Sequence, residues 1–79
     1  MMSNLVSDET VLKLTAIWEA ELGVAVTPQD DFFDLGGDSL LALAVARKAR
    51  AAGISMRAGA VLRHSTVAAL ADAVHRGVA

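Results

Sequence analysis

Ser39 is the residue of this chain whose setting departs most from what packing alone requires. Gly36, Gly37 and Asp38 precede it, and a helix-forming run beginning at Leu40 follows it. The glycines allow a sharp turn and leave room for a molecule to approach. The first amides of a helix have no intrahelical partners, so a phosphate diester on the Ser39 hydroxyl would be favoured there. Because no general base lies beside Ser39, the sequence predicts an acceptor of chemistry that another enzyme performs.

The same residues allow two other interpretations. Gly-Gly-Asp-Ser before a helix is good capping chemistry, and spacing alone favours Asp38 and Ser39 as simple helix caps. Gly-Asp-Ser-Leu at residues 37–40 also resembles the signature of a class of serine esterases, and Asp72 and His75 could complete a triad. Against the esterase, no strand precedes Ser39 and no further glycine or asparagine block supplies an oxyanion hole. Asp72 and His75 could simply pair on a helix surface.

Length and composition limit the protein to small domain classes. The 79 residues predict a single domain, 1–79, with its core at about 8–76. A hydrophobic content of 54% and a single proline exclude a disordered chain. The absence of cysteine removes disulfides, thiolate catalysis and cysteine metal sites, and two histidines are too few for a metal cluster. We expect no signal peptide, no membrane span and a cytoplasmic location.

Charge is divided unevenly along the chain. Residues 1–40 carry eight acidic side chains and one basic one, whereas residues 41–79 carry six basic side chains and one acidic one. The basic residues are thinly spread and aromatic residues are few, so we expect no nucleic-acid partner.

Periodicity predicts an all-α fold, a small bundle of three main helices and one short helical turn. The first helix is expected over 8–22, with Ser7 as its N-cap, and its apolar stripe comprises Val11, Leu14, Trp18 and Leu22. The second is expected over 39–52, ended by Gly53. The last is expected over 66–76, capped by Ser65 or Thr66, with a stripe of Val67, Leu70, Ala71 and Val74.

Two segments between these helices are less regular. Residues 24–38 predict a long loop, whose Phe32, Phe33 and Leu35 are expected to fold onto the helices. Trp18 and both phenylalanines are expected in the core. A short turn is expected over 58–62, weakened by Gly59.

Residues 30–40, Asp-Asp-Phe-Phe-Asp-Leu-Gly-Gly-Asp-Ser-Leu, resemble the attachment motif of peptidyl carrier proteins, the thiolation domains of nonribosomal peptide synthesis. Further matches at residues 17–23, 53–54 and 66–71 extend the resemblance over roughly residues 11–75. It implies a four-helix carrier fold in which Ser39 receives 4′-phosphopantetheine from coenzyme A. It also implies that Asp38 helps to bind the transferase's metal and coenzyme A, with Gly37 and Leu40 beside the attachment point.

The resemblance further implies the protein's partners. A phosphopantetheinyl transferase modifies the carrier, an adenylation enzyme loads it, and condensation, tailoring or thioesterase enzymes receive its aminoacyl or peptidyl thioester. The carrier itself is not an enzyme and is expected to be a monomer. The apolar start of the second helix predicts partner docking through Leu40, Leu41 and Ala44. An acyl carrier of polyketide or fatty-acid type is the alternative, but such carriers often have acids on this helix, where basic residues stand here.

The sequence departs from the family pattern at two places. The family often has proline before the threonine at position 66, where this chain has Ser65, and a larger apolar residue near position 62, where it has Leu62. We therefore expect the third helix to be short, mobile or loosely packed. We also expect a free-standing carrier, although a domain excised from a larger enzyme would look similar.

Overall fold

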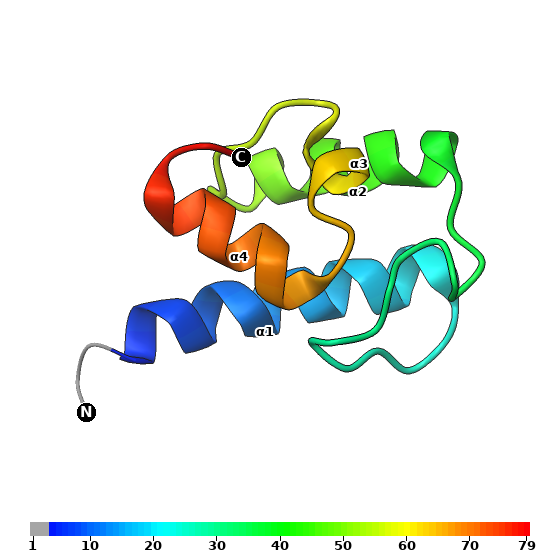
Figure 1. Cartoon of the computed structure of the whole chain (residues 1–79), viewed down its shortest axis with the longest axis horizontal. Coiled ribbons are helices and arrows are strands. Elements are labelled where there is room, and N and C mark those ends of the chain that lie inside the picture. The colour runs from blue at the N-terminus through cyan, green and yellow to red at the C-terminus, as the bar shows by residue number, and fades with distance from the viewer. Residues whose placement is uncertain (1–3) are drawn as a thin grey trace.

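Residues 4–79 form four helices, in the order α1 (Asn4–Leu22), α2 (Ser39–Ala51), α3 (Ala60–Arg63) and α4 (Val67–Arg76). Figure 1 shows them in a computed structural model, which describes residues 4–79 and the side chains from residue 9 onward. α1 and α2 run antiparallel (Figure 1), α1 packs against both α2 and α4, and α3 packs against α2. The prediction of an all-α bundle with three main helices, one short helix and a long loop after the first is confirmed.

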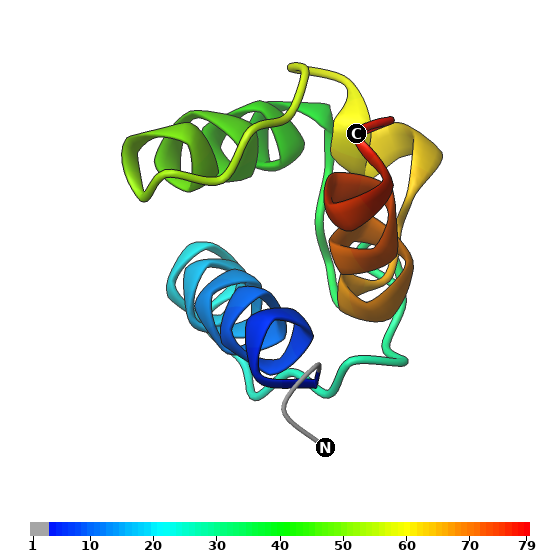
Figure 2. The ribbon, with the colours of Figure 1, turned by 90° about the vertical axis from the view of Figure 1, so that its left-hand side faces the viewer.

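The core lies where α1, α2 and α4 face one another, as the end-on view shows (Figure 2). Both predicted apolar stripes point into it: Leu14, Trp18, Val67 and Leu70 are fully buried. Each fully buried side chain of this size stabilises the fold by about 1.5–3 kcal/mol. On α2 the buried positions are mostly small, which lets that helix approach its neighbours closely; they are Ala42, Val45, Ala46 and Ala49.

Hydrogen bonds close both ends of α2. Asp38 has an extended backbone, and its Oδ1 accepts a hydrogen bond from the Leu41 amide at 2.9 Å. At the other end Gly53 has a φ of +87°, a left-handed conformation that favours glycine. The Ile54 amide then donates to the carbonyl of Ala49 at 2.9 Å, which satisfies a carbonyl of the last turn. The Asp38 side chain therefore determines that α2 begins at the next residue, Ser39.

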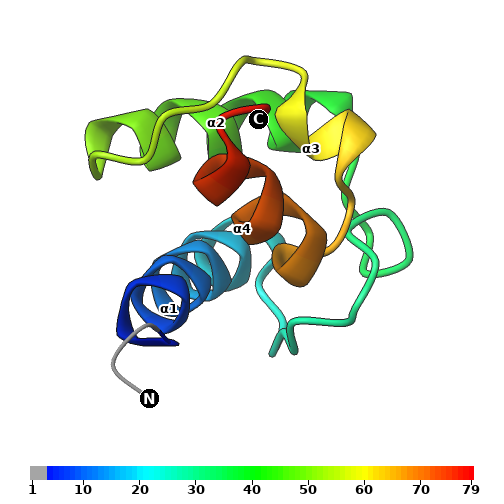
Figure 3. The ribbon, with the colours of Figure 1, turned by 60° about the vertical axis from the view of Figure 1, so that its left-hand side comes forward.

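The long loop between α1 and α2 runs beside the start of α4 (Figure 3). The Phe32 amide donates to the carbonyl of Ser65 at 2.7 Å, and the Ala68 amide donates to the carbonyl of Pro28 at 3.0 Å. Asp31 and Thr66 form an isolated antiparallel bridge. These backbone bonds tie the loop to the connection between α3 and α4, so its course is set by tertiary contacts.

Two expectations about the first half of the chain are wrong. α1 begins at Asn4, so Ser7 lies inside the helix and does not cap it. No glycine or proline interrupts residues 4–7, and nothing in that stretch stops the helix from extending past Ser7. Phe33 is 39% exposed and does not belong to the core, although its ring packs edge-on against Phe32 with centroids 5.5 Å apart.

The structure also corrects the description of the third helix. α3 is short, as expected, but it covers Ala60–Arg63 because Gly59 stands before the helix as its N-cap residue. Ala60 and Val61 are fully buried, whereas Leu62 is 51% exposed, so only the first half of α3 packs into the core. Among residues 4–79, no helix is both long and apolar enough to cross a membrane.

Candidate functional site

Ser39 is the first residue of α2 and its side chain is exposed to solvent. The N-terminal end of α2, where the long loop enters it, lies toward one end of the molecule's longest axis (Figure 1). Among the described side chains, none forms a hydrogen bond with the Ser39 hydroxyl. A helix normally leaves the amides of its first turn without internal acceptors, and these amides attract anions. The hydroxyl is therefore accessible, and a phosphate bound to it would lie in a favourable field.

Gly36 and Gly37 shape the approach to Ser39 in different ways. Gly36 has a φ of +98°, which side-chain-bearing residues rarely adopt. Gly37 donates its amide to the carbonyl of Phe32 at 3.0 Å. A Cβ on Gly37 would collide with the Phe32 ring and lie 2.8 Å from the Phe32 carbonyl oxygen. Glycine is thus required at position 37 because the backbone rests directly on a buried ring.

Phe32 connects this turn to the core. It is fully buried, and its ring meets that of Trp18 edge-on, with centroids 4.8 Å apart and planes at 73°. Such aromatic pairs contribute about 0.5–1.5 kcal/mol beyond the area they bury. The prediction that Trp18 and Phe32 are core residues is confirmed.

Asp31, next to Phe32, is the most strongly hydrogen-bonded acid of the loop. Its carboxylate accepts from the Ser65 hydroxyl at 2.6 Å, from the Phe33 amide at 3.0 Å and from the Asp34 amide at 3.1 Å. The hydrogen bond from Ser65 and those from the two amides lower the pKa of Asp31 below its ordinary value. The sequence alone does not reveal this pair, because 34 residues separate Ser65 from Asp31 and no local pattern joins them.

Residues 12–74 match the family model described as Phosphopantetheine attachment site. The chain belongs to this family. The cofactor of the family is covalently attached 4′-phosphopantetheine, and its carrier domains are not catalytic. The described residues fit such a group, since the exposed hydroxyl of Ser39 lies at a helix N-terminus that follows two glycines in the chain.

Curated proteins related to this attachment domain are much longer than it is. One of the proteins that make up the linear gramicidin synthase of Brevibacillus parabrevis is 36% identical over 74 residues, which is 92% of this chain. Chondramide synthase from Chondromyces crocatus is 43% identical over 60 residues, or 75% of this chain. The chain spans 2% of the length of each of these relatives.

Solved structures of carrier proteins share the fold. A structure titled non-ribosomal PCP domain superposes with a TM-score of 0.75 and 43% identity, covering 81% of this chain and 84% of that one. A type-II acyl carrier protein from Streptomyces verticillus, involved in bleomycin biosynthesis, superposes with a TM-score of 0.79 and 29% identity. That likeness covers 92% of this chain and 90% of the other.

The side chains that follow Ser39 form an exposed apolar strip on the attachment domain. Leu40 is 78% exposed, while Leu41 and Ala44 are half-buried. Leu43 is 39% exposed, and its spacing of three residues from Leu40 puts both on one face of α2. Leu43 was not among the predicted docking residues, although this helical spacing could have identified it. Leu41 also packs against the core, which makes it a structural residue as well as a surface one.

The structure does not assemble the esterase triad. The start of α2 lies near one end of the longest axis, whereas the C-terminal half of α4 lies toward the other end (Figure 1). Ser39 is the first residue of α2, and Asp72 and His75 belong to the C-terminal half of α4. Asp72 pairs with Arg76, with Oδ2 and Nη1 3.3 Å apart. The match of residues 37–40 to the esterase signature is therefore a chance similarity over four residues.

Proposed function

We propose that this attachment domain is a peptidyl carrier whose Ser39 bears the 4′-phosphopantetheine arm. The observation that carries the proposal is the exposure of Ser39 at the first position of α2, in a chain of this family. The arm supplies a thiol that holds an aminoacyl or peptidyl group as a thioester between enzymes of nonribosomal peptide synthesis. Residues 1–79 then act as one carrier domain, and tethering gives the cargo a high effective concentration at each partner.

The carrier's own residues have limited tasks in its modification. Ser39 Oγ forms the new P–O bond to the pantetheine phosphate, the pyrophosphate P–O bond of coenzyme A breaks, and adenosine 3′,5′-bisphosphate leaves. No described side chain is hydrogen-bonded to Ser39, so the transferase supplies the base that takes its proton. The Leu41 amide already donates to Asp38, so the amides of Ser39 and Leu40 stabilise the attached phosphate diester, while Gly37 and Leu40 flank it.

Intact mass after incubation with coenzyme A and a broad-specificity phosphopantetheinyl transferase tests the attachment. The wild-type protein should gain the mass of one phosphopantetheine, and Ser39→Ala should gain none. Ser55→Ala is a matched control, because Ser55 is also an exposed serine but lies between α2 and α3. No gain in the wild type, or an equal gain in Ser39→Ala, refutes the proposal.

Asp38 has two separable roles under this proposal. Its Oδ1 caps α2, and its charge would help to hold the transferase's metal ion and coenzyme A. Asp38→Asn keeps a capping oxygen and removes the charge. We expect slower modification with little change in thermal stability; unchanged modification would limit Asp38 to capping.

The peptidyl subclass is favoured over the acyl subclass by two observations. The chain is 43% identical to the nonribosomal domain and 29% identical to the acyl carrier protein. After Asp38 the charges of α2 are all basic, namely Arg47, Lys48 and Arg50. Offered adenylation enzymes with amino acids and ATP, or a malonyl transferase with malonyl coenzyme A, the phosphopantetheine form should accept aminoacyl groups. Acceptance of malonyl groups alone would establish the acyl carrier instead.

Leu40, Leu41 and Ala44 form the proposed docking surface for the transferase and for adenylation, condensation, tailoring or thioesterase enzymes. Leu40→Glu should slow modification and aminoacyl loading, since it places a charge on the most exposed leucine of α2. Leu12→Glu on α1 is the matched control, because Leu12 is 69% exposed and lies on another helix. Equal rates in both variants would remove the docking role. The carrier is proposed to act as a monomer, which sedimentation equilibrium tests.

A further inference from the structure

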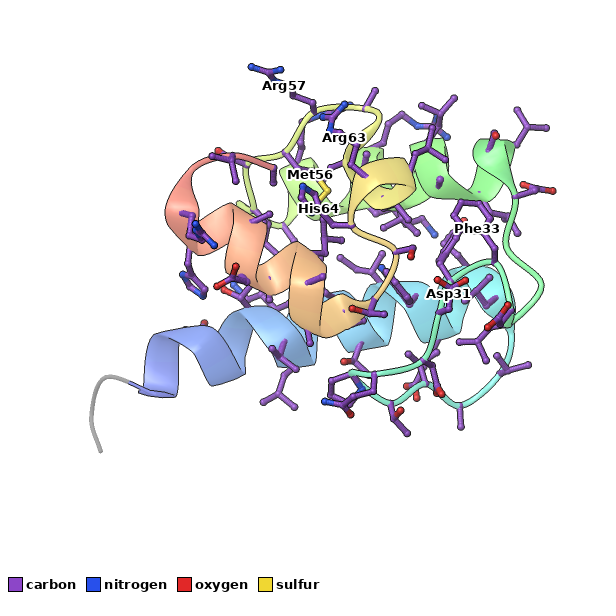
Figure 4. The ribbon with its side chains drawn as sticks, viewed as in Figure 1. Asp31, Phe33, Met56, Arg57, Arg63 and His64 are labelled. Carbon is purple, nitrogen blue, oxygen red and sulfur yellow. The ribbon has the colours of Figure 1, made fainter. Side chains whose placement is uncertain are left out.

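Ser65, in the connection between α3 and α4, is distant in sequence from the long loop but holds that loop directly. Its hydroxyl donates to the Asp31 carboxylate at 2.6 Å, and its carbonyl accepts from the Phe32 amide at 2.7 Å. We refer to these two hydrogen bonds as the clasp. Figure 4 shows Asp31 inside the long loop, with Phe33 next to it on the side where α2 begins.

A continuous series of contacts leads from the clasp to Ser39. The clasp fixes the backbone of Phe32, whose ring is buried against Trp18. The Phe32 carbonyl accepts the Gly37 amide at 3.0 Å, and the Gly37 backbone rests on the Phe32 ring. Asp38 follows and caps α2, and Ser39 is the next residue. Phe32 is therefore linked to Ser39 through the directly contacting residues Gly37 and Asp38.

We propose that Ser65 is a positioning residue for the modification of Ser39, acting through Asp31 and Phe32. The proposal rests on the proposed function. The charged acceptor strengthens the Ser65 hydrogen bond, because hydrogen bonds to ionised groups are stronger than those between neutral groups. Without the hydroxyl, Asp31 keeps only the amides of Phe33 and Asp34, both within its own turn, and the loop loses its side-chain bond to the α4 side.

Ser65→Ala tests this through two measurements made well below the unfolding temperature. The first is hydrogen exchange at the Gly37 amide. Loss of one hydrogen bond corresponds to about a tenfold change in an equilibrium constant, so exchange at this amide should become about tenfold faster. The second is transferase kinetics with the full chain. Because a smaller fraction of molecules presents Ser39 correctly, the KM for the carrier should rise about twofold or more while kcat stays unchanged.

Two further variants separate positioning from general stability. Ser65→Thr keeps the hydroxyl and should restore both the Gly37 exchange rate and the KM. Ser55→Ala removes an exposed hydroxyl elsewhere and should change neither measurement. An unchanged KM in Ser65→Ala, or an unchanged exchange rate, overturns the proposal. If wild-type Ser39 is never modified, the proposed function fails and the positioning role fails with it, whereas wild-type modification with an unchanged KM refutes the positioning role alone.

Discussion

Gly37→Ala offers the sharpest test of how the attachment turn is supported. The added Cβ would collide with the Phe32 ring and lie 2.8 Å from the Phe32 carbonyl oxygen, a backbone atom that cannot rotate away. Adding a methyl group to a well-packed site costs about 1–3 kcal/mol. Displacing the ring from Trp18 would forfeit about 0.5–1.5 kcal/mol more. These terms add to about 1.5–4.5 kcal/mol, and the lower unfolded-chain entropy of alanine offsets about 0.4–1 kcal/mol of that. We therefore expect the free energy of unfolding to fall by about 2–3 kcal/mol, near the middle of the resulting range.

This loss can be measured by thermal unfolding followed by circular dichroism. In a domain of this size, 1 kcal/mol corresponds to about 4–8 °C in Tm, so Gly37→Ala should lower Tm by about 8–24 °C. A chain of 79 residues has a total stability of roughly 4–12 kcal/mol. The variant should therefore remain folded at 25 °C, which allows its modification at Ser39 to be measured as well.

Gly59→Ala is the matched control for this experiment. Gly59 has a φ of −89°, and the nearest atom to an added Cβ would be Nη1 of Arg63 at 3.6 Å, an ordinary contact. Replacing glycine with alanine reduces the entropy of the unfolded chain equally in both variants. Gly59 is also the N-cap residue of α3, where alanine costs up to about 1 kcal/mol more than glycine. The excess loss in Gly37→Ala is therefore a lower bound on the cost of the collision at position 37. If Gly37→Ala and Gly59→Ala have the same Tm, the account of Gly37 resting on Phe32 is wrong.

Hydrogen bonds and ion pairs elsewhere in the domain lead to three more predictions. Asp38→Ala should lower the free energy of unfolding by about 1 kcal/mol in urea denaturation, because the Leu41 amide loses its acceptor. Below about pH 4, wild-type stability should fall more steeply than that of Asp31→Asn. The pKa of Asp31 is lowered in the folded state, so its contribution is present above its unfolded pKa and is lost as the pH falls through its folded pKa. Lys48→Met should lower the free energy of unfolding by at most about 1 kcal/mol, because Lys48 is half exposed in its ion pair with Glu21, which joins α2 to α1. A larger loss in urea denaturation would show that this pair contributes more than an ordinary surface pair.

Local patterns in the sequence were sufficient for most of the fold. The stripes through Leu14 and Trp18, and through Val67 and Leu70, repeat at the helical period and are buried as predicted. The starts of α1 and α3 were misplaced. No glycine or proline in residues 4–7 keeps α1 from beginning before Ser7, and Gly59 precedes α3, whereas it was expected inside the turn. Phe33 was also misplaced: Phe32 and Phe33 are identical in type, and only the turn geometry decides which ring is buried.

The same distinction applies to the attachment site: adjacent residues predict part of its structure, and contacts between distant residues determine the rest. The sequence indicates Gly36, Gly37 and Ser39 because the residues that form a turn and the following helix N-terminus are adjacent in the chain. Under the positioning proposal Ser65 supports this turn, at a position where the resemblance to peptidyl carriers implies proline. Proline has no side-chain donor, so at this position it could not make the hydrogen bond to Asp31 that Ser65 makes. The departure at Ser65 instead provides a side-chain bond that joins the loop leading to Ser39 to the connection between α3 and α4.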